Sequence, residues 1–357
     1  PDDVEFLPTG ESPLKHHEGF LRTTCPVCGG EAVRETDTMD TFVDSSWYFL
    51  RFADPTNEGL PFDRAAVAHW LPVDQYIGGV EHAVLHLLYA RFWHKVLFDL
   101  GHVSTPEPFF KLVNQGLILG EDGQKMSKSR GNVVDPWDAI STFGVDAIRW
   151  YFVTVSQPWV PKRFDTEALA EAARRTFDTL ANTYRFLALY ANLEGWKPSA
   201  DDPAPGERPV LDRWILSRVS GVAERVTADM EAYEATRAAR AVADFIVDDL
   251  SNWYVRRSRD RFWGSGDTAD TRAAFRTLHE VLLELARLLA PFTPFLADWL
   301  HRALTGGQSV HLVGFPEAAA RNERLDEGMR VTRVLARLGR AAREEVRIRV
   351  RQPLGTL

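Results

Sequence analysis

Apolar residues in the first half of the chain recur in patterns that predict alternating strands and helices. Asp74-Gln-Tyr-Ile77 is a short strand candidate that stops at Gly78-Gly79. Residues 81–100 carry apolar side chains at helical spacing and predict an amphipathic helix. Residues 110–119 form a second strand region, and a capped helix begins at Asp135-Pro136. Strand, helix, strand and helix in this order predict half of a doubly wound parallel sheet.

Beyond about residue 166 the strand signals disappear and long helical patterns take their place. Apolar residues such as Ile215, Val219, Val222 and Val226 fall on one helical face, as in helices that pack together. Long amphipathic helices joined by short loops predict a helical bundle. We expect these helices near residues 166–192, 209–232, 235–262 and 270–304.

The chain is therefore expected to have three parts. Residues 1–165 are predicted to be the α/β part, and residues 166–305 the all-α bundle. For residues 306–357 we expect a small mixed α/β tail. Its predicted elements are a helix near 321–343 and strands at 310–313 and 345–351.

Composition excludes several classes of protein. The 357 residues are 45% hydrophobic and 26% charged, which is typical of soluble globular chains. No uninterrupted apolar run reaches the roughly 18 residues that cross a bilayer, so we expect no membrane contact. Residues 1–5 have neither the basic start nor the apolar core of a signal peptide, and we expect a cytoplasmic location. Two cysteines are too few for a disulfide-stapled scaffold.

The net charge of −8 is unevenly distributed along the chain. Residues 1–150 carry 12 Lys and Arg against 22 Asp and Glu, whereas residues 151–357 carry 30 against 28. Arginine in the second half is clustered from Arg330 to Arg351 and at a second group, Arg256, Arg257, Arg259 and Arg261. Clustered arginine favours phosphate contacts, and solvated helix faces are the alternative.

The most specific chemical pattern is a Lys- and Ser-rich loop between a turn and the capped helix. It contains Lys125, Ser127, Lys128 and Ser129 and ends at Gly131-Asn132. Mobile ammonium groups on such a loop can bind a triphosphate and stabilise the charge that builds on the α-phosphate and the departing pyrophosphate. The residue types alone are also compatible with a solvated surface loop.

The string Lys125-Met-Ser-Lys-Ser129 resembles the signature loop of class I aminoacyl-tRNA synthetases, and Asn132-Val-Val-Asp-Pro136 resembles their leucine, isoleucine and valine subgroup. The resemblance implies activation of an amino acid by ATP with Mg²⁺, followed by transfer of the aminoacyl group to tRNA. It implies that Lys128 is the main ATP contact, assisted by Lys125, with Ser127 and Ser129 at the same site. The implied fold is the second half of a Rossmann-like catalytic domain followed by an anticodon-binding helical bundle.

Gly78-Gly79-Val80-Glu81-His82 is a second pattern with chemical content. Glycines at the end of a strand let a nucleotide approach the backbone, and a helix start supplies N–H groups. Glu81 could accept hydrogen bonds from ribose hydroxyls. In the synthetases that the chain resembles, this position lines the adenosine pocket, together with His82. The same resemblance places Gly116, Leu117 and Ile118 in the strand whose backbone reads adenine.

His82 and His86 are four residues apart and so share one face of the predicted helix. The residues alone leave open a metal pair, the wall of a substrate pocket, and helix packing. Phe42, Ser45 and Tyr48 recur every three residues in a segment that resembles the leucine pocket of leucyl-tRNA synthetases. The resemblance implies that these five side chains surround a branched aliphatic substrate, leucine.

Cys25-Pro-Val-Cys28 has the spacing of a zinc knuckle but supplies only half of a four-ligand site. His16 and His17 are the nearest candidates for further ligands, and the other half could precede residue 1. A Zn²⁺ site and a reduced turn without metal are both open.

The second half of the chain resembles isoleucyl-tRNA synthetases at residues 249–263, 288–296 and 350–354. Isoleucine--tRNA ligase is therefore an alternative, and a non-catalytic tRNA-binding module is another. The family's His-x-Gly-His motif and editing insertion are missing, and the first residue is not Met. We expect a monomeric fragment without its N-terminal half, inactive alone, in which Arg256, Arg257, Arg259 and Arg261 contact tRNA.

Overall fold

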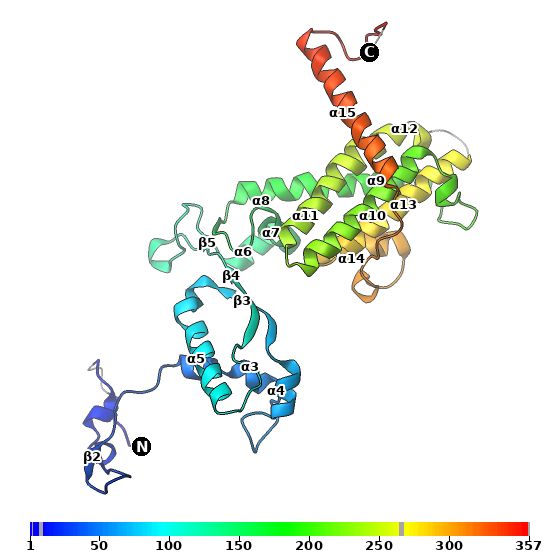
Figure 1. Cartoon of the computed structure of the whole chain (residues 1–357). Coiled ribbons are helices and arrows are strands. Elements are labelled where there is room, and N and C mark those ends of the chain that lie inside the picture. Colours follow the sequence, from blue (N-terminus) through cyan, green and yellow to red (C-terminus); the bar gives the residue numbers. More distant parts are fainter. Residues whose placement is uncertain (2, 7–9, 264–267, 356–357) are drawn as a thin grey trace. The chain divides into compact units, whose positions relative to one another are not determined.

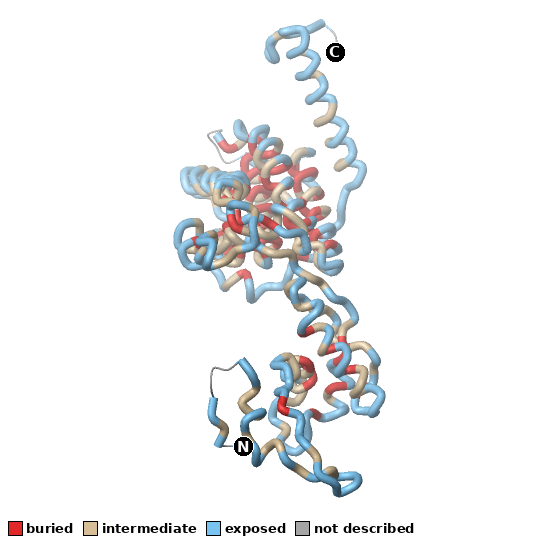
Figure 2. The backbone as a smooth tube through the Cα atoms, turned by 90° about the vertical axis from the view of Figure 1, so that its left-hand side faces the viewer, coloured by how far each residue is buried: buried red, intermediate tan, exposed pale blue. Residues whose placement is uncertain are grey.

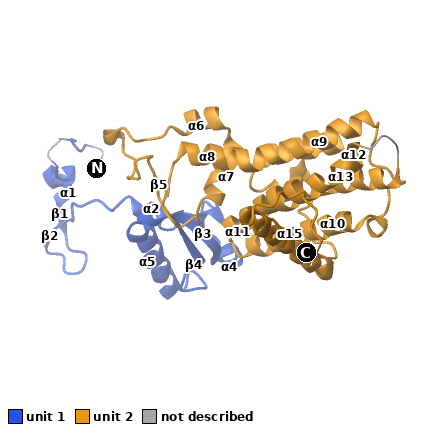
Figure 3. Ribbon diagram, turned by 90° about the horizontal axis from the view of Figure 1, so that it is seen from above, with its two compact units in different colours: residues 1–115 blue, residues 116–357 orange. Residues whose placement is uncertain are grey.

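The computed structural model describes residues 1, 3–6, 10–263 and 268–355. It divides into two compact units, residues 1–115 and residues 116–357, and each is described by itself (Figure 3). The expected limits of the three parts, at residues 165 and 305, stay a prediction.

A strand–helix–strand motif forms the core of the first unit. Strands β3 (Val73–Gly79) and β4 (Phe109–Gln115) pair in parallel along their whole length, and helix α5 (His86–Asp99) connects them. Parallel strands need such a crossover, so this arrangement confirms the expected half of a wound sheet. Helices α3 (Tyr48–Phe52) and α4 (Arg64–Trp70) supply Phe49, Leu50 and Val67 to its buried core.

Short elements precede this motif. They are η1 (Pro13–His16), α1 (Glu18–Leu21), the antiparallel strands β1 (Arg22–Thr24) and β2 (Glu31–Val33), and α2 (Phe42–Ser45).

The second unit begins with another parallel strand pair, β5 (Ile118–Leu119) and β6 (Lys162–Arg163). Between these strands lie η3 (Lys128–Arg130), α6 (Pro136–Phe143) and α7 (Val145–Thr154). Asp135 caps α6 as expected, since its carboxylate accepts a hydrogen bond from the Trp137 amide at 2.7 Å.

The rest of this unit is a helical bundle (Figure 1). The helices are α8 (Thr166–Ala173), α9 (Thr179–Leu193), α10 (Val210–Glu231), α11 (Ala235–Asp244), α12 (Arg256–Trp263), α13 (Ala269–Leu289), α14 (Pro294–Thr305) and α15 (Glu323–Glu345). The π-helical segments η4 (Arg174–Asp178) and η6 (Phe245–Val255) join α8 to α9 and α11 to α12, and the shorter 3-10 segment η5 (Pro205–Glu207) lies before α10.

Burial in the bundle follows the predicted helical faces. Ile215, Val219, Val222 and Val226 are all buried, and buried residues concentrate where these helices pack (Figure 2). Helix α15 has no buried residue and extends beyond the bundle (Figure 2). No helix within the described ranges is both long and apolar enough to span a bilayer.

Two helices that were predicted to be continuous are interrupted in the structure, so both predictions are wrong. The helix expected over 81–100 starts as the 3-10 segment η2 (Val80–Val84), and α5 begins only after Leu85, whose φ of −114° and ψ of −108° interrupt the helix. The helix expected over 270–304 is two helices, α13 and α14, because Pro294 forces the preceding residue out of helical conformation.

The predicted mixed tail is also wrong, because the described part of residues 306–357 contains helix and turns but no strand. Residues 310–312 form a 3-10 segment, η7 (Val310–Leu312), and residues 346–351 continue from α15 as turns. The alternating Arg pattern after residue 345 is strand-like, but a strand is stable only beside a partner strand. The predicted helix near 321–343 is confirmed as α15.

Candidate functional site

A cavity of about 350 Å³ lies at the carboxyl end of β3. Helices α2, α3 and α5, the segment η2 and strands β3 and β4 contribute its walls. Its lining residues are Phe42, Ser45, Tyr48, Tyr76, Ile77, Gly78, Gly79, His82, His86, Leu87 and Leu112. The structure thus brings together all five side chains expected around the substrate.

Aromatic rings form most of the wall. Phe42 stacks on Tyr89 with ring centroids 6.3 Å apart and meets the His82 ring edge-on at 6.5 Å. The rings of His82 and His86 lie 6.2 Å apart and nearly perpendicular, although His82 belongs to η2 and His86 begins α5. The two histidines therefore share the cavity without sharing a continuous helix.

Tyr76 lines the same cavity and was missed by the sequence analysis. Its hydroxyl lies 2.5 Å from the Tyr48 hydroxyl and 2.7 Å from Nε2 of His86, and its ring stacks on Phe109 at 3.9 Å. Strand alternation could have found it, because Tyr76 and Gly78 are two residues apart on β3 and so face the same side.

Two titratable groups of the cavity have shifted pKa values. Burial, followed by the hydrogen bond with Tyr48, raises the pKa of Tyr76 well above its ordinary range. Burial, followed by the electrostatic effect of His82, lowers the pKa of His86. Tyr76 therefore keeps its proton and His86 stays uncharged, which suits an apolar ligand.

The two glycines of β3 have different roles at the edge of the cavity. A Cβ atom at Gly79 would collide with the carboxylate of Glu81, which folds back over this residue. A Cβ atom at Gly78 would meet nothing, so the backbone there is open to a ligand. Gly78 therefore leaves room for close approach of a ligand, whereas Gly79 leaves room for Glu81.

The Lys- and Ser-rich loop lies in the second unit and is held at its two ends. The side chain of Asn132 accepts a hydrogen bond from the Ser127 amide at 2.9 Å and donates one to the Asp122 carboxylate at 3.1 Å. Met126 packs against the small apolar core around Ala139, and Gly131 adopts a left-handed φ of 69°.

Lys125 and Lys128 are both exposed, and no ion pair engages either ammonium group within the described ranges. Ser127 and Ser129 join their hydroxyls at 2.7 Å at the start of η3. The backbone anchors the loop while the two ammonium groups stay available to an anion.

Gly116, Leu117 and Ile118 run beside the segment that leads into β6. The Gly116 amide donates to the Pro158 carbonyl, and the Leu117 carbonyl accepts from the Lys162 amide, both at 2.9 Å. A Cβ atom at Gly116 would overlap the backbone of Val160, so only glycine fits. Since backbone groups alternate in direction along a strand, those of Ile118 face the opposite edge.

Cys25 and Cys28 lie on the turn between β1 and β2. Hydrogen bonds from the amides of Cys28 and Val27 lower the pKa of the Cys25 thiol. His17 instead accepts from the Phe20 amide and pairs with Asp3, and His16 lies near Glu11. The described residues contain no cluster of three potential metal ligands, so the predicted half site gains no further ligand among them.

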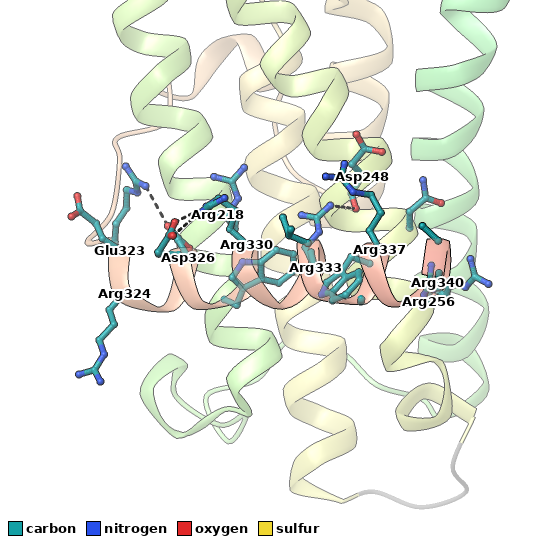
Figure 4. A pocket seen from close by; sticks show the side chains of 18 of the residues that line it. Arg218, Asp248, Arg256, Glu323, Arg324, Asp326, Arg330, Arg333, Arg337 and Arg340 are labelled. Atoms are coloured by element: carbon teal, nitrogen blue, oxygen red, sulfur yellow. Dashed lines mark hydrogen bonds and ion pairs between the residues drawn. The ribbon is translucent and has the colours of Figure 1, made fainter. Parts of the chain in front are cut away.

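A groove of about 1340 Å³ separates α15 from the bundle (Figure 4). Eight arginines and five carboxylates line it. Toward the start of α15, arginines are paired: Arg333 and Arg218 both bind the Asp249 carboxylate, and Arg321 binds Glu224 at 2.9 Å. The groove therefore brings together Arg256 of one arginine cluster and Arg330, Arg333, Arg337 and Arg340 of the other.

At the other end of the groove, the charge of the arginines is not neutralised by carboxylates of the described residues, and we call this the unneutralised end. Arg256 of α12 lies at the same end as Arg340 (Figure 4), and neither they nor Arg337 forms an ion pair with any described residue. Arg257 stacks over the Trp253 ring at 3.4 Å. Burial, then the charges of Arg340 and Arg256, lower the pKa of Arg257, so this end repels cations and attracts anions.

The remaining two arginines of the predicted tRNA set differ from Arg256. Arg259 is exposed but does not line the groove. Arg261 is occupied by the carboxylates of Asp212 and Asp270 inside the bundle. Its guanidinium is thus committed to structure, and we remove Arg261 from the residues proposed to meet tRNA.

Two family models match the chain. Residues 21–161 match the model described as tRNA synthetases class I (I, L, M and V). Residues 212–357 match the model described as anticodon-binding domain of tRNA ligase.

Full-length relatives are similar along most of this chain. The isoleucine--tRNA ligase of Thermus thermophilus is 40% identical over 98% of the chain and 33% of the relative. The leucine--tRNA ligase of Thermotoga petrophila is 43% identical over 84% of the chain and 34% of the relative. The chain thus spans about a third of the length of the curated relatives it matches.

Solved structures show the same fold. The ternary complex of Agrobacterium radiobacter K84 agnB2 LeuRS with tRNA and LeuAMS matches with a TM-score of 0.66 and 33% identity, over 91% of this chain and 38% of that chain. Mycobacterium tuberculosis methionyl-tRNA synthetase bound to methionyl-adenylate matches with a TM-score of 0.58 and 24% identity, over 78% of this chain and 51% of that chain, which supports the fold alone.

Proposed function

Because the chain belongs to the class I tRNA synthetases of the I, L, M and V group, we propose that it is part of a leucine--tRNA ligase. The proposed enzyme joins leucine to ATP as leucyl-adenylate with release of pyrophosphate, and then transfers the leucyl group to tRNA. Since the chain spans about a third of its relatives, this reaction is proposed for the longer enzyme.

The gathering of Phe42, Ser45, Tyr48, His82 and His86 around one cavity carries the choice of leucine. A branched aliphatic side chain can bury its methyl groups against rings whose polar ends are already paired. Isoleucine is the second candidate, favoured by the 40% identity to an isoleucine--tRNA ligase over 98% of the chain. An apolar cavity separates even side chains that differ by one methylene by only about 1–3 kcal/mol, so the substrate has to be measured.

Each unit carries groups that suit part of an ATP molecule. In the first unit, the open backbone at Gly78 and the carboxylate of Glu81 over Gly79 suit a ribose, with His82 beside them. The outward backbone of Ile118 offers a donor and an acceptor for adenine. Lys128 and Lys125 would neutralise the triphosphate, and the bound Mg²⁺ would share its charge.

The unneutralised end of the α15 groove is the proposed tRNA contact. Arg256, Arg337 and Arg340 supply positive charge without carboxylate partners in the described structure. Phosphate groups of an RNA backbone would relieve their mutual repulsion and that of Arg257.

ATP–pyrophosphate exchange tests the substrate. The chain is supplied with the N-terminal segment that precedes the matched region in the Thermotoga petrophila leucine--tRNA ligase, and exchange is measured with leucine and with isoleucine. We expect leucine-dependent exchange and negligible exchange by the chain alone. Exchange with isoleucine but not leucine would assign the chain to the second candidate. tRNA binding without exchange for either amino acid would instead favour a non-catalytic module.

A further inference from the structure

Tyr76 is the middle member of a three-residue hydrogen-bond chain at the floor of the cavity. Its hydroxyl contacts the Tyr48 hydroxyl at 2.5 Å on one side and Nε2 of His86 at 2.7 Å on the other. These residues come from α3, β3 and the first turn of α5. Tyr76 therefore links three separate elements through one oxygen atom.

The chain of hydrogen bonds satisfies the Tyr48 hydroxyl and Nε2 of His86, whereas Nδ1 of His82 is buried without a partner in the described structure. A neutral phenol donates one proton and accepts others, so Tyr76 donates to one neighbour and accepts from the other. In either direction, the Tyr48 hydroxyl and Nε2 of His86 both have a partner inside the protein. Nδ1 of His86 is buried without a hydrogen-bond partner and points to no competing protein group.

We propose that Tyr76 is a positioning residue that sets the specificity of the cavity for an aliphatic over a polar side chain, by tying the polar ends of Tyr48 and His86 to each other. The proposal rests on the function proposed above. Leucine can enter without breaking either of the two hydrogen bonds of Tyr76. Asparagine has nearly the same shape, but its amide would lose water and find those two partners already occupied.

The effect of the Tyr76 hydroxyl can be tested separately from that of its ring. The ring stacks on Phe109 with centroids 3.9 Å apart, and Tyr76→Phe keeps this contact while removing only the oxygen. Tyr89→Phe is the matched control on α5: its ring stacks on Phe42, and its hydroxyl has no hydrogen bond in the described structure.

The first experiment reads His86 directly in the purified 357-residue chain. Long-range ¹H–¹⁵N spectra of the imidazoles, assigned with His86→Gln, report the tautomer. We expect His86 to occupy a single tautomer in the parent chain and in Tyr89→Phe. In Tyr76→Phe we expect averaged nitrogen shifts, because Nε2 has lost its partner. Unchanged His86 shifts in a folded Tyr76→Phe chain would overturn the hydrogen-bond chain.

The second experiment measures specificity by ATP–pyrophosphate exchange in the completed enzyme described above. For Tyr76→Phe we expect the KM for leucine to rise about tenfold, because two buried polar groups lose their partner. The KM for ATP stays unchanged, and the preference for leucine over asparagine falls about tenfold. Tyr89→Phe should retain the parent's KM for leucine and its preference for leucine over asparagine.

The outcomes separate this inference from the proposed function. A folded Tyr76→Phe enzyme with an unchanged preference for leucine refutes the role of Tyr76 and leaves the proposed function intact. If the parent enzyme activates isoleucine and not leucine, the proposed substrate is wrong. The role of Tyr76 is then decided by the His86 tautomer and by discrimination between isoleucine and asparagine.

Discussion

Arg261 and Asp212 form a two-pronged ion pair inside the helical bundle, with Nη1–Oδ1 and Nη2–Oδ2 both at 2.7 Å. The Asp212 side chain is fully buried and also accepts a hydrogen bond from the Tyr254 hydroxyl at 2.8 Å. Asp270 binds the remaining edge of the guanidinium, so Arg261 joins α10, α12 and α13. This arginine holds the bundle together instead of facing solvent.

Removing Arg261 is expected to destabilise the bundle strongly. Arg261→Gln leaves the carboxylate of Asp212 buried without its counterion, and breaking such a pair costs roughly 3–5 kcal/mol. Urea unfolding of the chain, followed by circular dichroism at helix wavelengths, measures the loss. Arg259→Gln, at an exposed position on the same helix, should stay within about 0.5 kcal/mol of the parent. Equal effects of the two substitutions would contradict this assignment.

The sequence alone does not distinguish the role of Arg259 from that of Arg261. Arg256, Arg257, Arg259 and Arg261 are equivalent as letters, and their cluster predicts phosphate contacts. Their environments depend on partners far along the chain, such as Asp212, 49 residues before Arg261. Helical periodicity located the bundle because it is a local property, whereas ion-pair partners across helices are not.

Substitution of Lys128 is expected to slow activation without weakening leucine binding. Its ammonium group is exposed and unpaired in the described structure, so Lys128→Ala removes charge from the transition state and little from the fold. By analogy with the loss of one electrostatic donor, we expect exchange to slow by about 10²- to 10³-fold. Exchange kinetics with leucine and ATP varied separately provide the measurement.

Arg130→Ala is the control for charge on the same loop. Arg130 is equally exposed in η3 but lies outside the residues proposed to bind ATP. We expect only a small change in rate. If Lys128→Ala also raised the KM for leucine in proportion to its loss of rate, the loop would be acting through structure.

Most residues of the cavity at the carboxyl end of β3 were predictable from the sequence, whereas the partners of the Tyr76 hydroxyl were not. The resemblance to leucyl-tRNA synthetases implied Phe42, Ser45, Tyr48, His82 and His86 together, and all five line one cavity. The reasoning for the histidines was nevertheless wrong, because they do not share a continuous helix. Strand alternation places Tyr76 on the same side of β3 as Gly78, but the sequence does not show which partners its hydroxyl has.

The α15 groove is expected to bind tRNA mainly through phosphate contacts. Arg256 and Arg340 lie at its unneutralised end, so replacing both with Ala should weaken binding. Each lost phosphate contact should reduce the slope of log K against log salt by about 0.9. Filter binding of tRNA to the chain at several salt concentrations measures this slope.

Arg302→Ala is the matched control for overall charge. Arg302 lies on α14, outside the groove, and pairs with Asp298 at 2.7 Å. It should leave the salt slope unchanged. If Arg302→Ala lowered the slope as much as the replacement of Arg256 and Arg340, net charge and not the groove would account for the binding.

His94 is expected to make the first unit less stable as the pH falls. Its side chain is fully buried on α5, and Nε2 donates to the Thr105 carbonyl at 2.9 Å. Burial lowers the pKa of His94 below the ordinary value of 6.5, although the Thr105 carbonyl acts in the opposite direction. The unfolded chain therefore binds a proton that the folded chain does not, and the stability gained above pH 6.5 is lost as the pH falls below it.

Hydrogen exchange of α5 and β4 peptides between pH 5 and 7, corrected for intrinsic rates, measures this loss. His94→Gln can still donate to Thr105 but cannot titrate, so its protection should depend less on pH than that of the parent. A single histidine contributes at most about 1.4 kcal/mol per pH unit, which sets the size of the difference. His69→Gln, at an exposed position on α4, should retain the parent profile. If His94→Gln also retained it, protonation of another group would control the acid stability of this unit.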